Sequence, residues 1–368
     1  MLNAEMKTLQ DMSPDRLEEL IERFPRLRIA VLGDFFLDKY LDVDPGLAEV
    51  SVETGRTAHQ VVGIRHSPGA AGTVVCNLSA LGAGTLYAIG FTGDDGQSYE
   101  LRQDLTALRC STDHLHGDPQ RVTPTYLKPR DKTDPSLAGE HQRYDTKNRT
   151  ITPPTIERQI VDSLDTLLPQ LDALIVADQV EEEGCGVVTA EVRAALSAAA
   201  ARRPGVVFWA DSRRRIRQFR GMIIKPNQFE AVGSENPLPG DEVGLAALAE
   251  AVQRLRAQTG APICATRGAG GMLVSDPELM VVPGVRVEGP IDPTGAGDSA
   301  TAGAVLALAA GAALPEAALV GNLVASITIE QLATTGTARP DQLPERLQMW
   351  RSQREMTRSE SRREKRGQ

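Results

Sequence analysis

Short apolar runs alternate with helix-like stretches along most of this chain. Continuous apolar runs of strand length occur at residues 28–32, 85–90, 171–178, 205–211, 221–225 and 262–266. Strands that are apolar throughout are typical of parallel sheets covered on both faces, and their alternation with helices implies right-handed crossovers. The pattern therefore predicts an α/β fold with a mostly parallel central sheet flanked by helices.

Two segments, 38–66 and 121–146, have a different pattern. Polar and β-branched residues alternate in both, which indicates half-exposed antiparallel strands. We expect these segments to form a small β lid outside the main sheet.

The two ends of the chain are expected to lie outside the main domain, which we place at residues 26–345. Residues 1–25 are predicted to be a helical extension, because Ser13 can cap a helix whose first residue is Pro14. Residues 346–368 are arginine-rich with few apolar residues, so we expect a disordered basic tail.

Composition limits the partners that the protein can have. The formal charge of −9 over 368 residues argues against a general nucleic-acid binder. No apolar run is long enough to span a membrane, and the first residues lack a secretion signal, so we expect a cytoplasmic protein. The four cysteines are scattered without a C-x-x-C pair, which favours buried free thiols over a zinc site.

The sharpest chemical signal is the run Asp292-Pro293-Thr294-Gly295-Ala296-Gly297-Asp298 ahead of a small-residue apolar helix. Glycines before a helix let backbone N–H groups converge, and together with the helix dipole they can stabilise a transferring phosphoryl group. Asp298 would then accept the proton of an attacking hydroxyl.

Two other interpretations of this run are open. The glycines can serve helix packing, with Asp298 as an ordinary helix-start carboxylate. The run also fits a loose dinucleotide fingerprint, although Pro290 and Pro293 interrupt the strand that this fingerprint needs. A P-loop and the protein-kinase signatures are missing, so phosphoryl transfer would need another geometry.

The run resembles the second signature of the ribokinase (pfkB-type) carbohydrate kinase family. Other motifs agree in order and spacing: the glycine-rich segment 69–82, Gly93-Asp94-Asp95-Gly96, Lys225-Pro226-Asn227-Gln228-Phe229-Glu230, and Thr266-Arg267-Gly268. The runs at 33–40, 225–231 and 331–337 are most similar to the kinase domain of bifunctional heptose-phosphate kinase/adenylyltransferases. The H-x-G-H signature of an adenylyltransferase half does not occur in the sequence.

The resemblance implies an ATP-dependent sugar kinase that uses Mg²⁺ and, in many members, K⁺. In such a kinase Asp298 is the base, and Gly295, Ala296 and Gly297 form the anion hole. The residues implied to contact the sugar are Asp34, Gly69, Gly72, Thr73 and Asn77. Those implied to contact the nucleotide are Asn227, Glu230, Thr266, Gly268, Asn322 and Ser326. Glu230 would organise Mg²⁺ through water, and Asp292 with Thr294 would help to hold a monovalent cation. The family's lid strands often pair between subunits, so a homodimer is expected.

The sequence departs from the heptose-kinase pattern on the sugar side. Thr73 replaces an asparagine, Ala70 and Gly72 exchange the usual glycine and alanine, and the loop 47–55 differs. A basic residue of the Asp-Pro-Lys motif is retained as Arg213 or Arg214. The acceptor thus stays open among heptose phosphate, fructose, a fructose phosphate and a nucleoside. A non-catalytic sugar or nucleotide sensor on the same fold and a nicotinamide dehydrogenase are the rival functions.

Overall fold

A computed structural model describes residues 6–134, 139–234, 236–238, 240–332 and 335–366. Its centre is a parallel six-stranded sheet in the order β11-β10-β9-β2-β5-β6. The strands are β2 (Arg28–Gly33), β5 (Thr85–Gly93), β6 (Cys110–Asp118), β9 (Ala173–Asp178), β10 (Val207–Ser212) and β11 (Ile223–Ile224). This confirms the predicted parallel sheet.

A second sheet continues the first beyond β11. It contains β1 (Lys7–Thr8), β14 (Met280–Val282), β13 (Met272–Val274) and β12 (Cys264–Thr266), in that order. Parallel bridges join Ile224 to Ile263 and Asn227 to Thr266, so the ends of the two sheets meet at the segment that follows β11.

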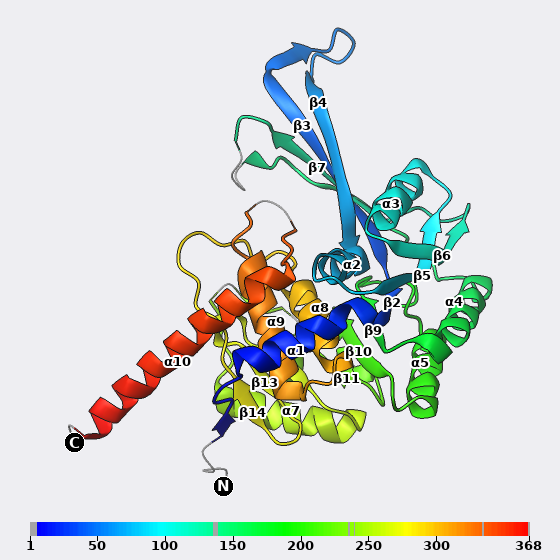
Figure 1. Cartoon of the computed structure of the whole chain (residues 1–368). Helices are drawn as coiled ribbons and strands as arrows, with labels where there is room; N and C mark the ends of the chain where they lie inside the picture. Colours follow the sequence, from blue (N-terminus) through cyan, green and yellow to red (C-terminus); the bar gives the residue numbers. More distant parts are fainter. Residues whose placement is uncertain (1–5, 135–138, 235, 239, 333–334, 367–368) are drawn as a thin grey trace.

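Helices cover both faces of the sheet (Figure 1). They are α1 (Pro14–Arg23), α2 (Ala71–Ala80), α3 (Gly96–Ala107), α4 (Pro154–Leu167), α5 (Ala190–Arg202), α6 (Gln228–Val232), α7 (Leu245–Thr259), α8 (Ala296–Ala309), α9 (Leu314–Thr328) and α10 (Leu343–Arg366). Successive residues of β2 face opposite cores: Ile29 and Val31 pack with α1, α2, α8 and α9, whereas Ala30 and Leu32 pack with α4 and α5. This alternation is why the strand is apolar throughout.

The predicted lid is a separate four-stranded sheet that projects from the body (Figure 1). Its order is β4-β3-β7-β8, from β4 (Thr57–Ala70), β3 (Phe35–Val50), β7 (Thr125–Asp131) and β8 (Tyr144–Thr146). The first pair is antiparallel as predicted, but β7 runs parallel to β3. Residues 135–138 of the predicted lid lie outside the described part of the chain.

Both ends of the described chain differ from the prediction. The segment before residue 26 is integrated into the domain, because β1 pairs with β14 and Leu17 and Leu20 of α1 are buried. The expected disordered tail is wrong for most of its length, since α10 continues to Arg366. Trp350 anchors this helix: its ring is buried and its indole N–H donates to the Pro283 carbonyl at 2.9 Å. Composition alone did not reveal this anchor.

Among the described residues no helix is long and apolar enough to cross a membrane. The four cysteines are free, as predicted, and three of them are buried.

Candidate active site

A cavity of about 360 Å³ lies between the lid and the body at the carboxyl ends of the central strands. One wall of the cavity comes from the lid, and a second wall comes from α2 and the loop before α8. The cavity is lined by Phe36, Asp38, Ala70, Thr73, Tyr126, Lys128, Arg143, Gln179, Arg213, Thr294, Gly295, Asp298 and Thr335. Three elements that are distant in sequence thus converge on the predicted base.

The turn before α8 has the geometry of an anion site. Gly295 precedes the helix with φ = +76°, a left-handed conformation that favours glycine. A Cβ at this position would lie 3.0 Å from Thr335 Cγ2 and 3.4 Å from Thr73 Cγ2. The N–H groups of the first helical turn have no acceptor within the helix and carry the positive end of its dipole. This turn is therefore suited to bind negatively charged oxygens.

Asp298 lies in this first turn with a carboxyl group of raised pKa. Burial raises the pKa to about 7 and the charge of Asp211 adds to the effect, whereas Lys225 and Arg213 oppose it and Asp38 adds a smaller increase. A carboxylate with this pKa can exchange a proton near neutral pH, as a general base must.

Behind Asp298, two charged residues of the central sheet form a buried ion pair. Asp211 lies on β10 and Lys225 directly follows β11, and Lys225 Nζ is 2.8 Å from Asp211 Oδ2. The Lys225 side chain is 5% exposed. Neither residue was among the predicted site residues.

The predicted N-x-x-E pair forms the start of α6. Asn227 Oδ1 accepts the N–H groups of Phe229 and Glu230 at 2.9 Å, and Glu230 Oε2 accepts the Asn227 N–H at 2.7 Å. The motif is thus a reciprocal capping box. Burial raises the Glu230 pKa to about 7, with Asn227 lowering it and Asp211 raising it.

Thr266 lies beside Asn227, as expected of two nucleotide-side residues, because the two form an isolated parallel bridge. Gly268 follows with φ = +52° and opens a short 3₁₀ turn. The Asn322 Nδ2 and Ser326 Oγ atoms are hydrogen-bonded within the protein: Asn322 Nδ2 donates to the Val282 and Pro283 carbonyls at 3.2 Å, and Ser326 Oγ donates to the Leu323 carbonyl at 2.7 Å. Their proximity to the adenine base of the nucleotide stays a prediction.

Asp292 shapes the loop before the anion site. Its Oδ1 accepts the Thr294 N–H at 3.0 Å, and its own N–H donates to the Ile329 carbonyl at 2.8 Å. Within the described ranges no cluster of three or more His, Cys, Asp or Glu side chains is arranged to hold a metal ion. A monovalent cation at Asp292 and Thr294 stays a prediction.

Asp34, one of the predicted sugar contacts, is hydrogen-bonded within the protein, and its contact with a sugar stays a prediction. It is 3% exposed, and its carboxylate accepts the backbone N–H groups of Gln179, Val180 and Val187 at 2.7–2.9 Å. Burial raises its pKa to about 6, with the nearby Asp178 charge adding to the effect. Asp34 therefore fixes the loop that follows β9, and its oxygens are already occupied.

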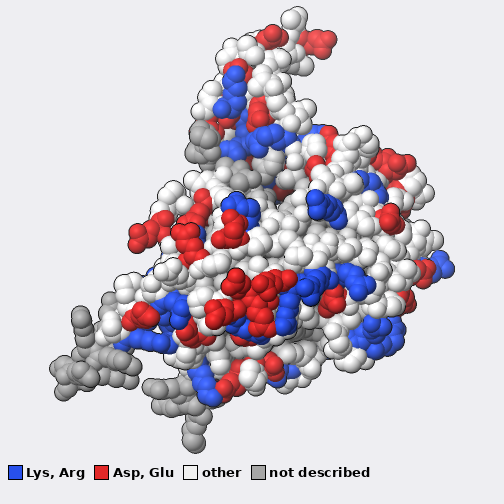
Figure 2. Space-filling view, viewed as in Figure 1, with Lys and Arg blue, Asp and Glu red and all other residues white. Residues whose placement is uncertain are grey.

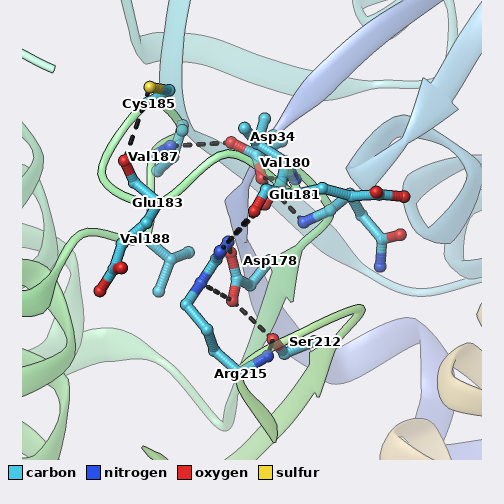
Figure 3. A network of polar contacts seen from close by, with 12 residues as sticks. Asp34, Asp178, Val180, Glu181, Glu183, Cys185, Val187, Val188, Ser212 and Arg215 are labelled. Carbon is cyan, nitrogen blue, oxygen red and sulfur yellow. Dashed lines mark hydrogen bonds and ion pairs between the residues drawn. The ribbon is translucent and has the colours of Figure 1, made fainter. Parts of the chain in front are cut away.

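The same loop is held by a second buried acid (Figure 3). Arg215 Nη2 donates to Asp178 Oδ1 at 2.6 Å, and Ser212 Oγ donates to Asp178 Oδ2 at 2.6 Å. Arg215 also donates to the Glu181 carbonyl at 3.1 Å. The network ties the loop after β9 to the turn after β10, and this turn carries Arg213 into the cavity. Of the two candidates for the Asp-Pro-Lys lysine, Arg213 lines this cavity and Arg214 does not.

Asn77, another predicted sugar contact, is also hydrogen-bonded within the protein, although its buried Oδ1 has no hydrogen-bond partner among the described groups and its sugar contact stays a prediction. It is fully buried, and its Nδ2 donates to the carbonyls of Thr73 at 3.1 Å and Gly336 at 3.4 Å. It cross-links the core, whereas Thr73, one turn earlier on α2, lines the cavity as predicted.

Asp38 is a second acidic residue that lines the cavity, and it was not among the predicted site residues. It lies on β3 and is 7% exposed, and its Oδ1 accepts no hydrogen bond from the described groups although Lys128 Nζ is 3.4 Å away. A Cβ on Gly69 would lie 3.1 Å from its Cγ, so the glycine leaves room for this carboxylate. Gly72 is needed for packing, because a Cβ there would lie 2.4 Å from Pro68 Cβ. The run 33–40 contains both aspartates, and of the two only Asp38 lines this cavity.

Comparison with solved structures defines the class of fold. Phosphofructokinase-2 from Escherichia coli, in complex with substrates and products, matches with a TM-score of 0.64 at 18% identity, over 87% of this chain and 98% of that one. Ribokinase from Cryptococcus neoformans in complex with ADP matches with a TM-score of 0.61 at 21% identity, over 87% and 99%. The fold is ribokinase-like, as the sequence predicted.

The chain belongs to the pfkB family of carbohydrate kinases, because the sequence profile described as "pfkB family carbohydrate kinase" matches residues 29–341. It is a phosphotransferase with a sugar hydroxyl as acceptor. Among curated relatives, the "Bifunctional protein HldE" of Caulobacter vibrioides is 30% identical over 332 residues, and that of Gluconobacter oxydans is 27% identical over 336. These matches cover 87% and 89% of this chain but only 63% and 66% of the relatives. The likeness to the heptose-kinase branch is confirmed.

Proposed function

We propose that this protein transfers the γ-phosphoryl group of ATP to a hydroxyl of a phosphorylated sugar of the heptose 7-phosphate type. The observation that carries the proposal is the position of Asp298. Its carboxyl group lies in the first turn of α8 and lines the same cavity as Asp38 and Thr73, and its pKa is about 7.

In this reaction the acceptor oxygen attacks the γ-phosphorus while its proton passes to Asp298. The bond from phosphorus to the β-phosphate oxygen breaks, and ADP leaves with the electron pair. The N–H groups of Gly295 and Gly297 lie in the turn that would stabilise the charge on the transferring oxygens, whereas the N–H of Ala296 donates to the Pro293 carbonyl at 3.1 Å. Closure of the lid would exclude water, which competes as an acceptor.

A cationic wall supports a phosphorylated acceptor. Lys128 and Arg143 from the lid and Arg213 from the body line the same cavity as Asp298. Each also has a carboxylate partner, which is Asp38 for Lys128, Asp145 for Arg143 and Glu181 for Arg213. Figure 2 shows Lys and Arg side chains gathered where the lid meets the body. Asp38 and Thr73 are suited to bind sugar hydroxyls, and the three cations are suited to bind a phosphate group.

The nucleotide would lie on the other side of Asp298, along Asn227, Thr266 and Gly268. The residues present fit ATP. The left-handed turn at Gly295 presents backbone N–H groups at the start of α8, and Lys225 supplies a buried ammonium, so both would attract the ATP phosphates. The capping box engages Glu230 Oε2, so the other carboxylate oxygen is left to hold a magnesium-bound water. Mg²⁺ would reduce the negative charge of the transferring group.

The exposed apolar residues of the lid hairpin support the proposal that the protein forms a homodimer. Val52 at its tip is 100% exposed, and Val50, Val62 and Ile64 are exposed as well. Such a row of apolar side chains beside a free strand edge is stabilised when a second copy covers it.

The proposal is tested by ATP consumption against a panel containing heptose 7-phosphate, fructose, fructose 6-phosphate and a nucleoside. We expect heptose 7-phosphate to give the highest kcat/KM and its unphosphorylated form to be at least tenfold poorer. A preference for fructose or a nucleoside would refute the acceptor. ATP binding without turnover on any acceptor would favour a sensor, and binding of NADH would favour a dehydrogenase.

A further inference from the structure

Lys225 places a buried positive charge against the catalytic turn. On one side its ammonium pairs with Asp211 at 2.8 Å. On the other side, Nζ lies 3.4 Å from the position that a Cβ on Gly297 would take. A side chain at position 297 would touch the ammonium, so the ammonium lies directly over the first turn of α8.

Three carboxylates, each from a different element, act on the Lys225 ammonium. Burial alone would lower the Lys225 pKa, but Asp211 on β10, Asp298 on α8 and Glu230 on α6 together hold it above its ordinary value. The ammonium in turn lowers the pKa of Asp298. Two further charged residues act on Asp298: Arg213, in the turn after β10, lowers its pKa, and Asp38, in the lid, raises it.

Stability alone does not account for this arrangement. A buried ion pair contributes little to stability, and apolar side chains of similar size often replace one without loss. The pair nevertheless lies at the one turn where phosphoryl oxygens would gather negative charge. The sequence also lacks the lysine of a P-loop, which supplies this cation in other phosphotransferases.

We propose that Lys225 is a catalytic residue whose ammonium contacts the γ-phosphoryl group during its transfer, and that Asp211 positions this ammonium. The inference rests on the proposed kinase function. Lys225 keeps its protons throughout: the acceptor proton goes to Asp298 and the electron pair leaves with ADP. The ammonium neutralises charge on the oxygens that move, so its effect is largest in the transition state.

The test compares Lys225→Met, Asp211→Asn and the double variant with Lys7→Met, which removes an exposed lysine that pairs with Glu278. Steady-state kinetics give kcat and the KM for ATP across pH, calorimetry gives ATP and ADP affinities, and thermal melting monitors folding. We expect Lys225→Met to lower kcat about 100-fold or more, with a change in KM below about tenfold. Lys7→Met should match the wild type.

The pH profiles separate catalysis from a structural ion pair. Loss of the ammonium raises the Asp298 pKa, so the acid limb of kcat should move to higher pH in Lys225→Met. Loss of the Asp211 carboxylate should move the limb to lower pH, with a loss in kcat below about tenfold. Equal losses in the two single variants, with no opposite shifts, would overturn the role of Lys225.

The double variant is the control for misfolding, because it removes both charges of the Lys225–Asp211 pair and leaves neither one buried without its partner. It should lose kcat about as strongly as Lys225→Met, and retention of kcat within about threefold would overturn the proposal. A wild-type protein that binds no ATP would instead refute the kinase function. Normal wild-type turnover with an unaffected Lys225→Met variant would refute only the role of the lysine.

Discussion

Asn227 and Glu230 cap each other: the Asn227 N–H donates to Glu230 Oε2 at 2.7 Å, and Asn227 Oδ1 accepts the Glu230 N–H at 2.9 Å. The motif that implies magnesium and phosphate binding is therefore also the local device that starts α6. A substitution here changes both functions unless it retains the hydrogen bond and removes only the charge.

Glu230→Gln is the variant that separates these two functions. Glutamine still accepts the Asn227 N–H, so the melting temperature should stay close to that of the wild type, whereas Glu230→Ala should lose about 1 kcal/mol. Both variants should require several-fold more Mg²⁺ for half-maximal activity. An unchanged magnesium requirement in Glu230→Gln would leave the residue with the capping role alone. Thermal melts and magnesium titrations of turnover provide the two measurements.

The two aspartates of the run 33–40 should give opposite phenotypes. Asp34→Ala leaves three buried N–H groups without their acceptor, so we expect a loss of about 3 kcal/mol or more in unfolding free energy. Asp172→Ala is the matched control, because Asp172 accepts one exposed N–H, that of Arg28, and should cost under about 1 kcal/mol. Denaturant unfolding measures both.

Asp38→Asn should instead raise the KM for the acceptor at least tenfold and lower the unfolding free energy by less than Asp34→Ala. The reason is that the Asp38 carboxylate lines the cavity and its Oδ1 accepts no hydrogen bond from the described groups, while loss of its charge leaves the Lys128 ammonium without this partner. An unchanged acceptor KM in Asp38→Asn would contradict this assignment, as would a normal stability in Asp34→Ala.

Much of the architecture could be predicted because it is encoded locally. The continuous apolar runs marked the parallel strands, and the alternating segments marked the lid. The glycines before residue 298 marked the left-handed turn. Each of these signals lies within about fifteen residues of the element that it specifies.

The features that the sequence did not reveal all concern contacts between distant segments. The Asp34 carboxylate accepts amides 145 to 153 residues away, and no local pattern indicates them. The Lys225 and Asp211 pair forms only when β10 and β11 lie side by side. Composition suggested a disordered tail because the contacts that hold α10 come from distant segments: Trp350 donates to Pro283, 67 residues away, and Arg351 pairs with Asp11, 340 residues away.

Ala70 should benefit from substitution by glycine. It precedes α2 with φ = +52° and ψ = −116°, a conformation that side chains disfavour. Ala70→Gly should therefore stabilise the fold by about 1 kcal/mol, with kcat within about twofold of the wild type. Gly72→Ala is the comparison: a Cβ there would lie 2.4 Å from Pro68 Cβ, so this variant should melt at a lower temperature. Destabilisation by Ala70→Gly would show that the alanine methyl group contributes to packing.

Asp298 links the pH dependence of activity to that of stability. The raised pKa of about 7 means that the carboxyl group is half-protonated near neutral pH. Because only the carboxylate can accept a proton, kcat should rise with pH and level off above about 7 to 8. Asp298→Asn should lower kcat about 100-fold or more and abolish this limb.

Stability should respond in the opposite direction. The unfolded chain loses this proton near the ordinary aspartate pKa, and the folded chain loses it only near 7, so the native state binds more protons between these values. The contribution of Asp298 to stability is therefore lost as the pH rises through that window. Asp298→Asn has no carboxyl group to ionise, so it should melt at a higher temperature than the wild type at pH 8 and with a smaller difference at pH 4. If Asp298→Asn is inactive and less stable than the wild type at both pH values, Asp298 has a structural role and is not the catalytic base.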